Sequence, residues 1–204
     1  MTAHDQSQSS YDVIVVGSGA GAMTSALFAA DQGLSVLIVE KSDKYGGTSA
    51  ISGGGIWIPN NHYFAAIGGQ DSPELSMQYL KAATGEHGDP LRLQAYLDNA
   101  APMIKKLTDN SRVRYAVADK YPDYYPQLPG ALAGGRTLDP ELFDTSLLAD
   151  ELPNLRKPSP STLLMGRIAW TARDAHKAMA RSFGWQWLIF KLMARYKLLS
   201  LIHI

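Results

Sequence analysis

A glycine-rich turn near the N-terminus constrains the fold more than any other feature of this sequence. The turn, GSGAGA at residues 17–22, separates a β-branched run at 13–16 from a segment rich in helix formers at 20–32. A second apolar run follows at 35–39. Strand, turn, helix and strand within residues 11–41 form one βαβ unit, in which the two strands are parallel. The unbroken apolar character of the first strand predicts burial on both of its faces.

The spacing of the small residues in this turn matches the GxGxxG/A fingerprint of dinucleotide-binding proteins. Gly17 permits the tight turn, Gly19 lets the backbone approach a pyrophosphate, and Ala22 lets the helix pack closely against the strand. The N-terminus of the helix then directs its amides and its dipole at the phosphates. Glu40 follows the second strand, where the fingerprint places an acid that accepts hydrogen bonds from the adenosine ribose. We therefore predict a dinucleotide site rather than a purely structural turn.

A second glycine cluster at residues 46–55, GGTSAISGGG, helps to choose between FAD and NAD. It combines hydroxyls at Thr48, Ser49 and Ser52 with unobstructed glycine amides. These groups can follow a cofactor from its pyrophosphate towards its ring, which favours FAD. The alternative is a flexible glycine loop without a ligand. The residues expected to bind the cofactor are Gly17, Ser18, Gly19, Ala20, Gly21, Ala22, Glu40, Lys41, Gly46, Gly47, Thr48, Ser49, Ser52, Gly53 and Gly54.

Three stretches of the sequence are similar to those of a known family. The run GGTSAISGGGIWIPNN at 46–61 combines a glycine-rich loop with a Trp-x-Pro-x-Asn segment, YPDYYP occupies 121–126, and GGR occupies 134–136. Together they resemble the fumarate reductase and succinate dehydrogenase flavoprotein superfamily, and within it the 3-ketosteroid Δ1-dehydrogenases. The resemblance implies an α/β fold, namely a Rossmann-like FAD-binding domain with a parallel sheet and flanking helices.

The resemblance also implies a reaction. These enzymes introduce a 1,2 double bond into a 3-keto steroid, removing one hydrogen as a proton and the other as a hydride to flavin N5. Tyrosines carry out the proton transfer, and Tyr124 matches the family tyrosine that assists the base. An unperturbed tyrosine has a pKa of about 10, so a pair of tyrosines that share the proton fits this chemistry. The expected partners are a steroid-like small molecule and an electron acceptor.

Other residues have less specific interpretations. The alternative for Tyr124 is a phenol at the surface of a proline-rich loop. Arg136 could contact cofactor or substrate, be a solvated loop charge, or clamp the backbone. His62, His87 and His176 have no partners at metal-ligand or triad spacing, so we expect surface or capping roles and no metal site.

Composition argues against several other classes of protein. Lys+Arg and Asp+Glu are both 19, so the zero net charge gives no reason to expect a nucleic-acid partner. The chain has no cysteine, which excludes disulfides and thiolate metal sites. No apolar run reaches the ~18 residues that a transmembrane helix needs. Residues 1–10 are polar and unlike a signal peptide, so we expect a short disordered lead and a cytoplasmic location.

Helical patterning continues through the middle of the chain. The starts at Ser72-Pro73 and Asp89-Pro90 predict helices over 72–84 and 89–110, and a third is expected over 171–183. The proline- and serine-rich residues 153–162 predict a connector. Side chains expected on the buried helix faces are Met77, Tyr79, Leu80, Leu91, Leu93, Tyr96, Leu97, Met103, Ile104 and Leu107.

The resemblance finally implies parts that this sequence lacks. In the superfamily a later strand with an Ala-Thr-Gly-Gly-type or Gly-Asp motif closes the FAD fold, and we identify no such closing segment. Residues 11–198 are therefore expected to form only the N-terminal part of the FAD-binding domain, without the catalytic domain. Residues 199–204 are a candidate non-native tail, because they also match a translated transposon end used in preparing sequencing libraries. Two alternatives stay open: a fumarate or urocanate reductase-like flavoprotein, and an inactive FAD-binding fragment.

Overall fold

The computed structural model describes residues 10–199. The disordered lead expected at 1–10 and the non-native tail expected at 199–204 lie outside the described residues, apart from one residue of each. Contacts divide the described chain into two compact units. The first contains the chain up to Ser52 together with Asp144–Ile168, and the second contains Gly53–Phe143 and Ala169–Leu198.

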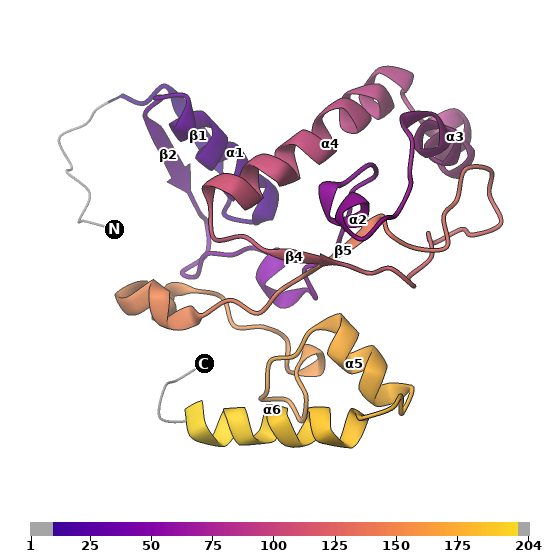
Figure 1. Ribbon diagram of the computed structural model, residues 1–204. Coiled ribbons are helices and arrows are strands. Elements are labelled where there is room, and N and C mark those ends of the chain that lie inside the picture. Colours follow the sequence, from indigo (N-terminus) through magenta and orange to yellow (C-terminus); the bar gives the residue numbers. More distant parts are fainter. Residues whose placement is uncertain (1–9, 200–204) are drawn as a thin grey trace. The chain divides into compact units, whose positions relative to one another are not determined.

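The first unit contains the expected βαβ unit. β1 (Val13–Val16) and β2 (Val36–Val39) are parallel neighbours, and α1 (Ala20–Asp31) connects them and contacts both (Figure 1). Gly33 has a φ of +81°, which allows the chain to turn away after the helix. The parallel pair and the bounds of its three elements agree with the sequence prediction to within one residue.

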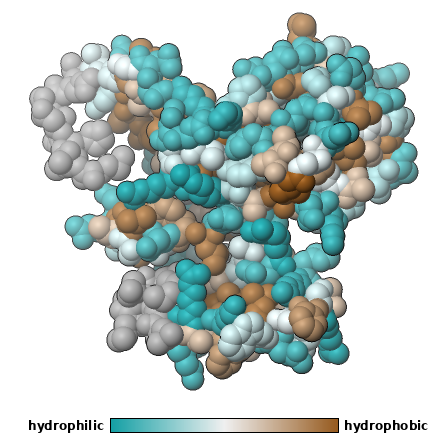
Figure 2. Space-filling view, in the orientation of Figure 1, coloured by the Kyte–Doolittle hydropathy of each residue, from teal (hydrophilic) through white to brown (hydrophobic). Residues whose placement is uncertain are grey.

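One face of β1 is uncovered, which differs from the prediction of burial on both faces. Ile14 is 60% exposed and Val16 82%, whereas the alternate residues Val13 and Val15 are half-buried. Successive side chains of a strand point to opposite faces, so only one face of β1 is covered in the described chain. Apolar side chains, brown in Figure 2, are accordingly exposed over the region of β1 and β2.

The later part of the first unit packs against the loop that follows β2. Leu155 forms an isolated parallel bridge with Tyr45. The Tyr45 amide and carbonyl are hydrogen-bonded, at 3.0 and 2.9 Å, to the backbone on either side of Leu155. The segment from residue 153 onward was predicted to be only a connector, but its residues 154–156 pair with the backbone of Tyr45. The short 3-10 helices of this unit are η1 (Ser49–Ile51), η3 (Thr145–Asn154) and η4 (Pro160–Thr162).

The second unit contains a three-stranded antiparallel sheet in the order β3-β5-β4. Its strands are β3 (Ile56–Trp57), β4 (Tyr115–Val117) and β5 (Thr137–Pro140). Its helices are α2 (His62–Ala66), α3 (Pro73–Thr84), η2 (Gly85–His87), α4 (Pro90–Asn110), α5 (Ala172–Met179) and α6 (Trp185–Leu199).

The predicted starts of the long helices are confirmed. The side chains of Ser72 and Asp89 accept hydrogen bonds from backbone amides in the first turns of α3 and α4, at 3.2 and 2.9 Å. Each cap satisfies an amide that has no partner within the helix. The third helix begins as predicted, with Thr171 and Asp174 forming a capping box, but α5 ends at Met179 rather than near residue 183.

Packing of α3 and α4 buries part of the predicted apolar set. Tyr79, Leu97, Ile104 and Leu107 are buried, and Ile104 is fully enclosed. Leu91 was expected in this set and is 81% exposed. It lies in the first turn of α4, and the helical pattern alone did not reveal that this turn faces solvent.

Candidate cofactor-binding site

The turn after β1 adopts the geometry expected of the fingerprint. Gly17 has a φ of +100°, in the left-handed region that favours glycine, and its amide donates to the Val39 carbonyl at 2.7 Å. Gly19 is the N-cap of α1 and has no side chain to bond the amides of the first turn. No acidic residue lies in that turn. The N-terminus of α1 therefore has the amides, the dipole and the absence of negative charge that suit an anion.

A hydroxyl from the second glycine cluster already contacts this N-terminus. The Ala20 amide donates to Ser49 Oγ at 3.0 Å. Ser49 is exposed in η1, so its side chain has room to rotate. A ligand oxygen bound at the same amide would take over the acceptor role that Ser49 fills here.

The two glycine clusters touch through their backbones. Gly47 has a φ of +56°, and a Cβ atom on it would lie 2.9 Å from Gly19 Cα. Gly46 has a φ of +112°, and a Cβ atom there would lie 2.8 Å from the Cβ of Ala50. Real Cβ atoms do not approach other carbons so closely, so both positions require glycine. This contact holds the second cluster against the fingerprint turn.

Ser18 connects the fingerprint turn to the acid after β2. It is 4% exposed, and its hydroxyl donates to Glu40 Oε2 at 2.5 Å while accepting from the Gly46 amide at 2.9 Å. The other oxygen of Glu40 accepts from the Ser42 amide at 3.0 Å. The hydrogen bond from Ser18, followed by that from Ser42, lowers the pKa of Glu40. Glu40 is thus ionised at neutral pH and oriented as a hydrogen-bond acceptor.

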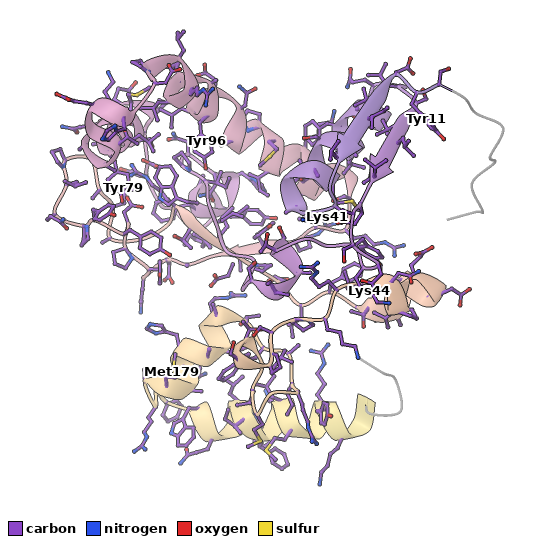
Figure 3. The ribbon with its side chains drawn as sticks, turned by 180° about the vertical axis from the view of Figure 1, so that it is seen from behind. Tyr11, Lys41, Lys44, Tyr79, Tyr96 and Met179 are labelled. Atoms are coloured by element: carbon purple, nitrogen blue, oxygen red, sulfur yellow. The ribbon has the colours of Figure 1, made fainter. Side chains whose placement is uncertain are left out.

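These groups fit the pyrophosphate and ribose portion of a dinucleotide. The first unit brings the anion-binding amides of α1 together with the fixed carboxylate of Glu40. The contact between Gly19 and Gly47, which admits only glycine, holds the second cluster beside them. Lys41 is exposed in the loop after β2, where Figure 3 labels it together with Lys44. The predicted residues that the structure brings together are Gly17, Ser18, Gly19, Ala20, Glu40, Gly46, Gly47 and Ser49.

The remaining predicted residues are less closely tied to this site. Thr48 and Ser52 are exposed in the first unit, and the Ser52 hydroxyl donates to the Ser49 carbonyl at 2.9 Å. Gly53 and Gly54 belong to the second unit. A Cβ atom on Gly54 would lie 2.9 Å from a carbon of the Pro140 ring, so this glycine is required by packing against β5.

Tyr124 lies in the second unit, at its surface. Its side chain is 81% exposed, and its ring meets the ring of Tyr121 edge to face, with 6.4 Å between centroids. Interaction with the neighbouring Tyr124 phenol raises the pKa of Tyr121. Tyr121 therefore keeps its proton at neutral pH and is paired with the phenol for which a catalytic role was predicted.

Arg136 is not a solvated loop charge. It is 1% exposed, and its guanidinium forms ion pairs of 2.7 and 2.8 Å with Asp71 and Asp123. It also donates to the Gly130 carbonyl at 2.9 Å, which agrees with the interpretation as a backbone clamp. Sequence reasoning did not identify Asp71 or Asp123. Asp71 had no signal beyond an acid before Ser-Pro, and Asp123 lies in the YPDYYP stretch that carried the resemblance, where only Tyr124 was given a role.

Two of the three histidines lie at the surface, as expected, and the third does not. His87 and His176 are exposed, whereas His62 is half-buried at the start of α2. Burial, followed by the charge of Lys105, lowers the pKa of His62. Among residues 10–199, no three His, Asp or Glu side chains are grouped in a way that could hold a metal ion. Within the same residues, no helix is both long enough and apolar enough to cross a membrane.

Comparison with known families decides which dinucleotide this site suits. The model of the FAD binding domain family matches residues 12–197. The chain belongs to this FAD-binding family. The match covers both glycine clusters and both compact units, so the cofactor is FAD, and the Rossmann-like fold predicted from the sequence is confirmed.

Individual relatives narrow the resemblance. A 3-oxosteroid 1-dehydrogenase of Comamonas testosteroni is 39% identical over 187 residues, which are 91% of this chain and 32% of the relative. A 4-oxocyclohexanecarboxylate 2-dehydrogenase of Sinomonas cyclohexanicum is 41% identical over 178 residues, covering 82% of this chain and 31% of the relative. These matches, with the structure described next, confirm the predicted resemblance to the ketosteroid dehydrogenases.

A solved structure matches almost the whole chain. It is the 3-ketosteroid delta1-dehydrogenase from Sterolibacterium denitrificans in complex with 1,4-androstadiene-3,17-dione, with a TM-score of 0.88 and 52% sequence identity. The match covers 92% of this chain and 33% of that one. The chain thus spans about a third of the length of the relatives that it matches. That it corresponds to their N-terminal portion stays a prediction.

Proposed function

We propose that this chain is the FAD-binding portion of a dehydrogenase that introduces a 1,2 double bond into a 3-keto steroid. The observation that carries the proposal is the likeness to the Sterolibacterium denitrificans enzyme, at 52% identity over 92% of the chain. That structure was determined with a steroid that has both a 3-ketone and a double bond in the same ring. The relative from Sinomonas cyclohexanicum acts on a smaller ring ketone, so dehydrogenation next to a ring ketone is the chemistry that these two enzymes share.

We assign the cofactor contacts to the first unit. The amides of Gly17 to Ala22 would bind the pyrophosphate at the N-terminus of α1, and Glu40 would accept hydrogen bonds from the ribose hydroxyls. Ser18 orients Glu40, and Gly46 and Gly47 hold the second cluster against the turn. Contacts from Lys41, Thr48, Ser49, Ser52, Gly53 and Gly54 to the cofactor stay predictions.

We assign Tyr124 to the proton transfer. When bound, FAD supplies the acceptor for the two electrons that leave the substrate. The chain's own contribution is a phenol that assists removal of the proton next to the ketone. The exposed Tyr124 hydroxyl is available to a group outside the described chain, and Tyr121 beside it is a second phenol with which it could share a proton. The electron acceptor that reoxidises the protein and the cytoplasmic location stay predictions.

The test uses the full-length product of the gene, purified with bound FAD and kept under anaerobic conditions. We expect the flavin absorbance to bleach on addition of 4-androstene-3,17-dione, with a new 1,2 double bond in the recovered steroid. If 4-oxocyclohexanecarboxylate bleaches the flavin and the steroid does not, the substrate is a smaller ring ketone rather than a steroid. If the steroid has no effect while fumarate or urocanate reoxidises the reduced flavin, the reductase alternative is correct.

A separate measurement addresses the 204-residue chain itself. We expect it to retain FAD through the first unit, because the described contacts between the glycine clusters and Glu40 all lie there. Purified chain with a stoichiometric yellow cofactor would support this expectation. A colourless chain that gains no cofactor on incubation with FAD would instead support the inactive-fragment alternative.

A further inference from the structure

A buried charged cluster in the second unit has no part in the proposed cofactor contacts. Arg136 lies at its centre, with a side chain that is 0% exposed. The guanidinium binds Asp71 in a bidentate manner, with N–O distances of 2.7 and 2.9 Å, and binds Asp123 at 2.8 Å. Its central carbon lies 5.5 Å from the ring of Trp57 and 5.7 Å from that of Tyr79. We call these five residues the Arg136 cluster.

The two carboxylates of the cluster anchor different parts of the chain. Asp71 accepts from the amides of Asn60, at 3.0 Å, and of Ser72, at 2.8 Å, so it fixes the turn before α2 and the start of α3. Asp123 accepts from Trp57 Nε1 at 2.7 Å and from the Leu132 amide at 2.9 Å. The Asp123 amide donates in turn to the Leu132 carbonyl at 3.0 Å.

Tyr124 therefore follows a residue whose carboxylate and backbone amide are both held by hydrogen bonds. Asp123 is 4% exposed, with both carboxylate oxygens and its amide hydrogen-bonded. On the other side, the Tyr125 amide donates to the Tyr79 hydroxyl at 3.2 Å. Figure 3 labels Tyr79 on α3. The backbone of Tyr124 is thus fixed at both ends, while its phenol is 81% exposed.

Stability alone is a weak reason for a buried ion cluster beneath an exposed phenol. Burying two carboxylates around one guanidinium leaves a net negative charge away from water, and such ion clusters are weak contributors to stability compared with apolar packing. A functional side chain, by contrast, benefits from a support that prevents it from moving, because small misplacements reduce rates strongly. The cluster is arranged to do this for Tyr124.

We propose that Arg136 and Asp123 are positioning residues for Tyr124: Arg136 fixes the Asp123 carboxylate, and Asp123 fixes the backbone from which the Tyr124 phenol projects. The inference rests on the catalytic role proposed for Tyr124. Asp71 binds the Nε and Nη2 atoms of Arg136, whereas Asp123 binds Nη1, so Asp71 acts on Tyr124 only indirectly, through Arg136 and the start of α3.

The experiment compares Asp123→Asn with Asp71→Asn in the full-length protein, with rates expressed per bound flavin. Both variants remove one carboxylate from the same arginine. We expect Asp123→Asn to lower kcat for 4-androstene-3,17-dione by about 10- to 100-fold, with KM changed by less than about twofold. We also expect it to shift the pH profile of kcat. Asp71→Asn keeps the pair of Arg136 and Asp123 and loosens only the other edge of the guanidinium, so we expect its kcat to fall by less than about threefold and its pH profile to shift less than that of Asp123→Asn, even if its melting temperature falls.

A double-variant cycle separates positioning from general damage. Tyr124→Phe alone should lower kcat, and adding Asp123→Asn to it should have little further effect, because the side chain being positioned is already disabled. Equal losses of kcat in Asp123→Asn and Asp71→Asn, or an undiminished effect of Asp123→Asn in the Tyr124→Phe background, would overturn the proposal. If Asp123→Asn does not retain flavin, the comparison uses Trp57→Phe instead, because this variant removes one hydrogen-bond donor to Asp123.

A second measurement does not depend on turnover. 3-Fluorotyrosine placed at position 124 reports the order of that ring by fluorine NMR. We expect one sharp resonance in the wild type and in Asp71→Asn, and a broadened or split resonance in Asp123→Asn. An unchanged resonance in Asp123→Asn overturns the positioning inference even if the protein is a steroid dehydrogenase. If the resonance changes in Asp123→Asn but the protein does not act on the steroid, the proposed function is wrong while Asp123 still orders the ring of Tyr124.

Discussion

Gly47 makes its contact through the absence of a side chain. Its backbone lies against that of Gly19, and its φ of +56° belongs to the region that other residues adopt with strain. Two separate physical effects therefore act at one position, a conformational one and a steric one. Gly85 has the same φ of +56° but open space around it, which allows the two effects to be measured separately.

We expect Gly85→Ala to lower the free energy of unfolding by about 1 to 3 kcal/mol through backbone strain alone. Gly47→Ala should cost a further amount of about 1 to 3 kcal/mol, because its Cβ would displace Gly19. It should also reduce the amount of FAD retained on purification, which Gly85→Ala should leave unchanged. Denaturant titration and flavin content check both parts. Equal behaviour of the two variants would show that the backbone contact has no role.

Ser18 offers a prediction about pH. Its hydrogen bond is the main cause of the lowered pKa of Glu40, so the carboxylate stays ionised further into the acid range than an ordinary glutamate. Ser18→Ala removes that donor, and the pKa of Glu40 should rise towards its usual value. We expect FAD affinity to fall about threefold to tenfold at neutral pH. On acidification, the loss of affinity should begin at a higher pH than in the wild type.

Fluorescence quenching of FAD, titrated across the acid range, measures this effect. Ser25→Ala is the matched control. Ser25 lies in α1, directly after the fingerprint turn, and its hydroxyl donates to the Gly21 carbonyl of the same helix at 2.9 Å rather than to Glu40. A parallel shift of the acid limb in both variants would contradict the assigned role of Ser18.

At the scale of elements, β1 provides two neighbouring valines in opposite surroundings. Val15 is half-buried on the covered face, and Val16 is 82% exposed on the other. We expect Val15→Thr to lower the free energy of unfolding of this chain by about 1 to 2 kcal/mol, because a hydroxyl would enter an apolar contact. Val16→Thr should change it by less than about 0.5 kcal/mol. Chemical denaturation of both variants tests the assignment, and a larger effect at Val16 would mean that this face is covered.

Elements with local signals were predicted well. The bounds of α1, α3 and α4 follow from glycine at a helix end and from Ser72 and Asp89 as caps, all of which act within one helical turn. The antiparallel sheet of the second unit was not predicted. Its strands β3 and β4 are short and pair with β5 across long sequence separations. No hairpin turn in the sequence indicates these pairings.

The candidate site shows the same division. The fingerprint, Glu40 and the hydroxyls of the second cluster could be identified because fixed spacings connect them. The Arg136 cluster could not, because Arg136 and Asp71 are 65 positions apart and nothing in either neighbourhood specifies the partner. The exposed second face of β1 was equally hidden, since an apolar run is the same whether or not a layer covers it.

At the scale of the whole molecule, acid stability should depend in part on the buried carboxylate of Asp71. Burial raises the pKa of Asp71, but hydrogen bonds from Arg136 and from neighbouring amides lower it by more, so the folded value lies below the ordinary one. The stabilisation is therefore complete above the unfolded pKa of about 3.9 and is lost as the pH falls through the lower folded value.

We expect Asp71→Asn to reduce stability at neutral pH and to flatten its dependence on pH below about 4. Hydrogen exchange over residues 53–143, followed during acidification, reports the unit to which Asp71 belongs. Asp98→Asn replaces an exposed carboxylate on α4 and should leave the pH dependence as in the wild type. A wild-type pH profile in Asp71→Asn would mean that this ion pair does not govern acid unfolding.

The return of the chain to the loop after β2 also has a consequence during synthesis on the ribosome. The Tyr45 hydroxyl donates to the Glu151 carbonyl, 106 positions later in the sequence. At ordinary rates of translation, the loop that carries Gly46 and Gly47 is therefore made about 5 to 20 seconds before the segment around Glu151 with which it pairs. During that interval the nascent first unit has its cofactor-binding turn but not the segment that braces it, and it must be kept from aggregating by other means.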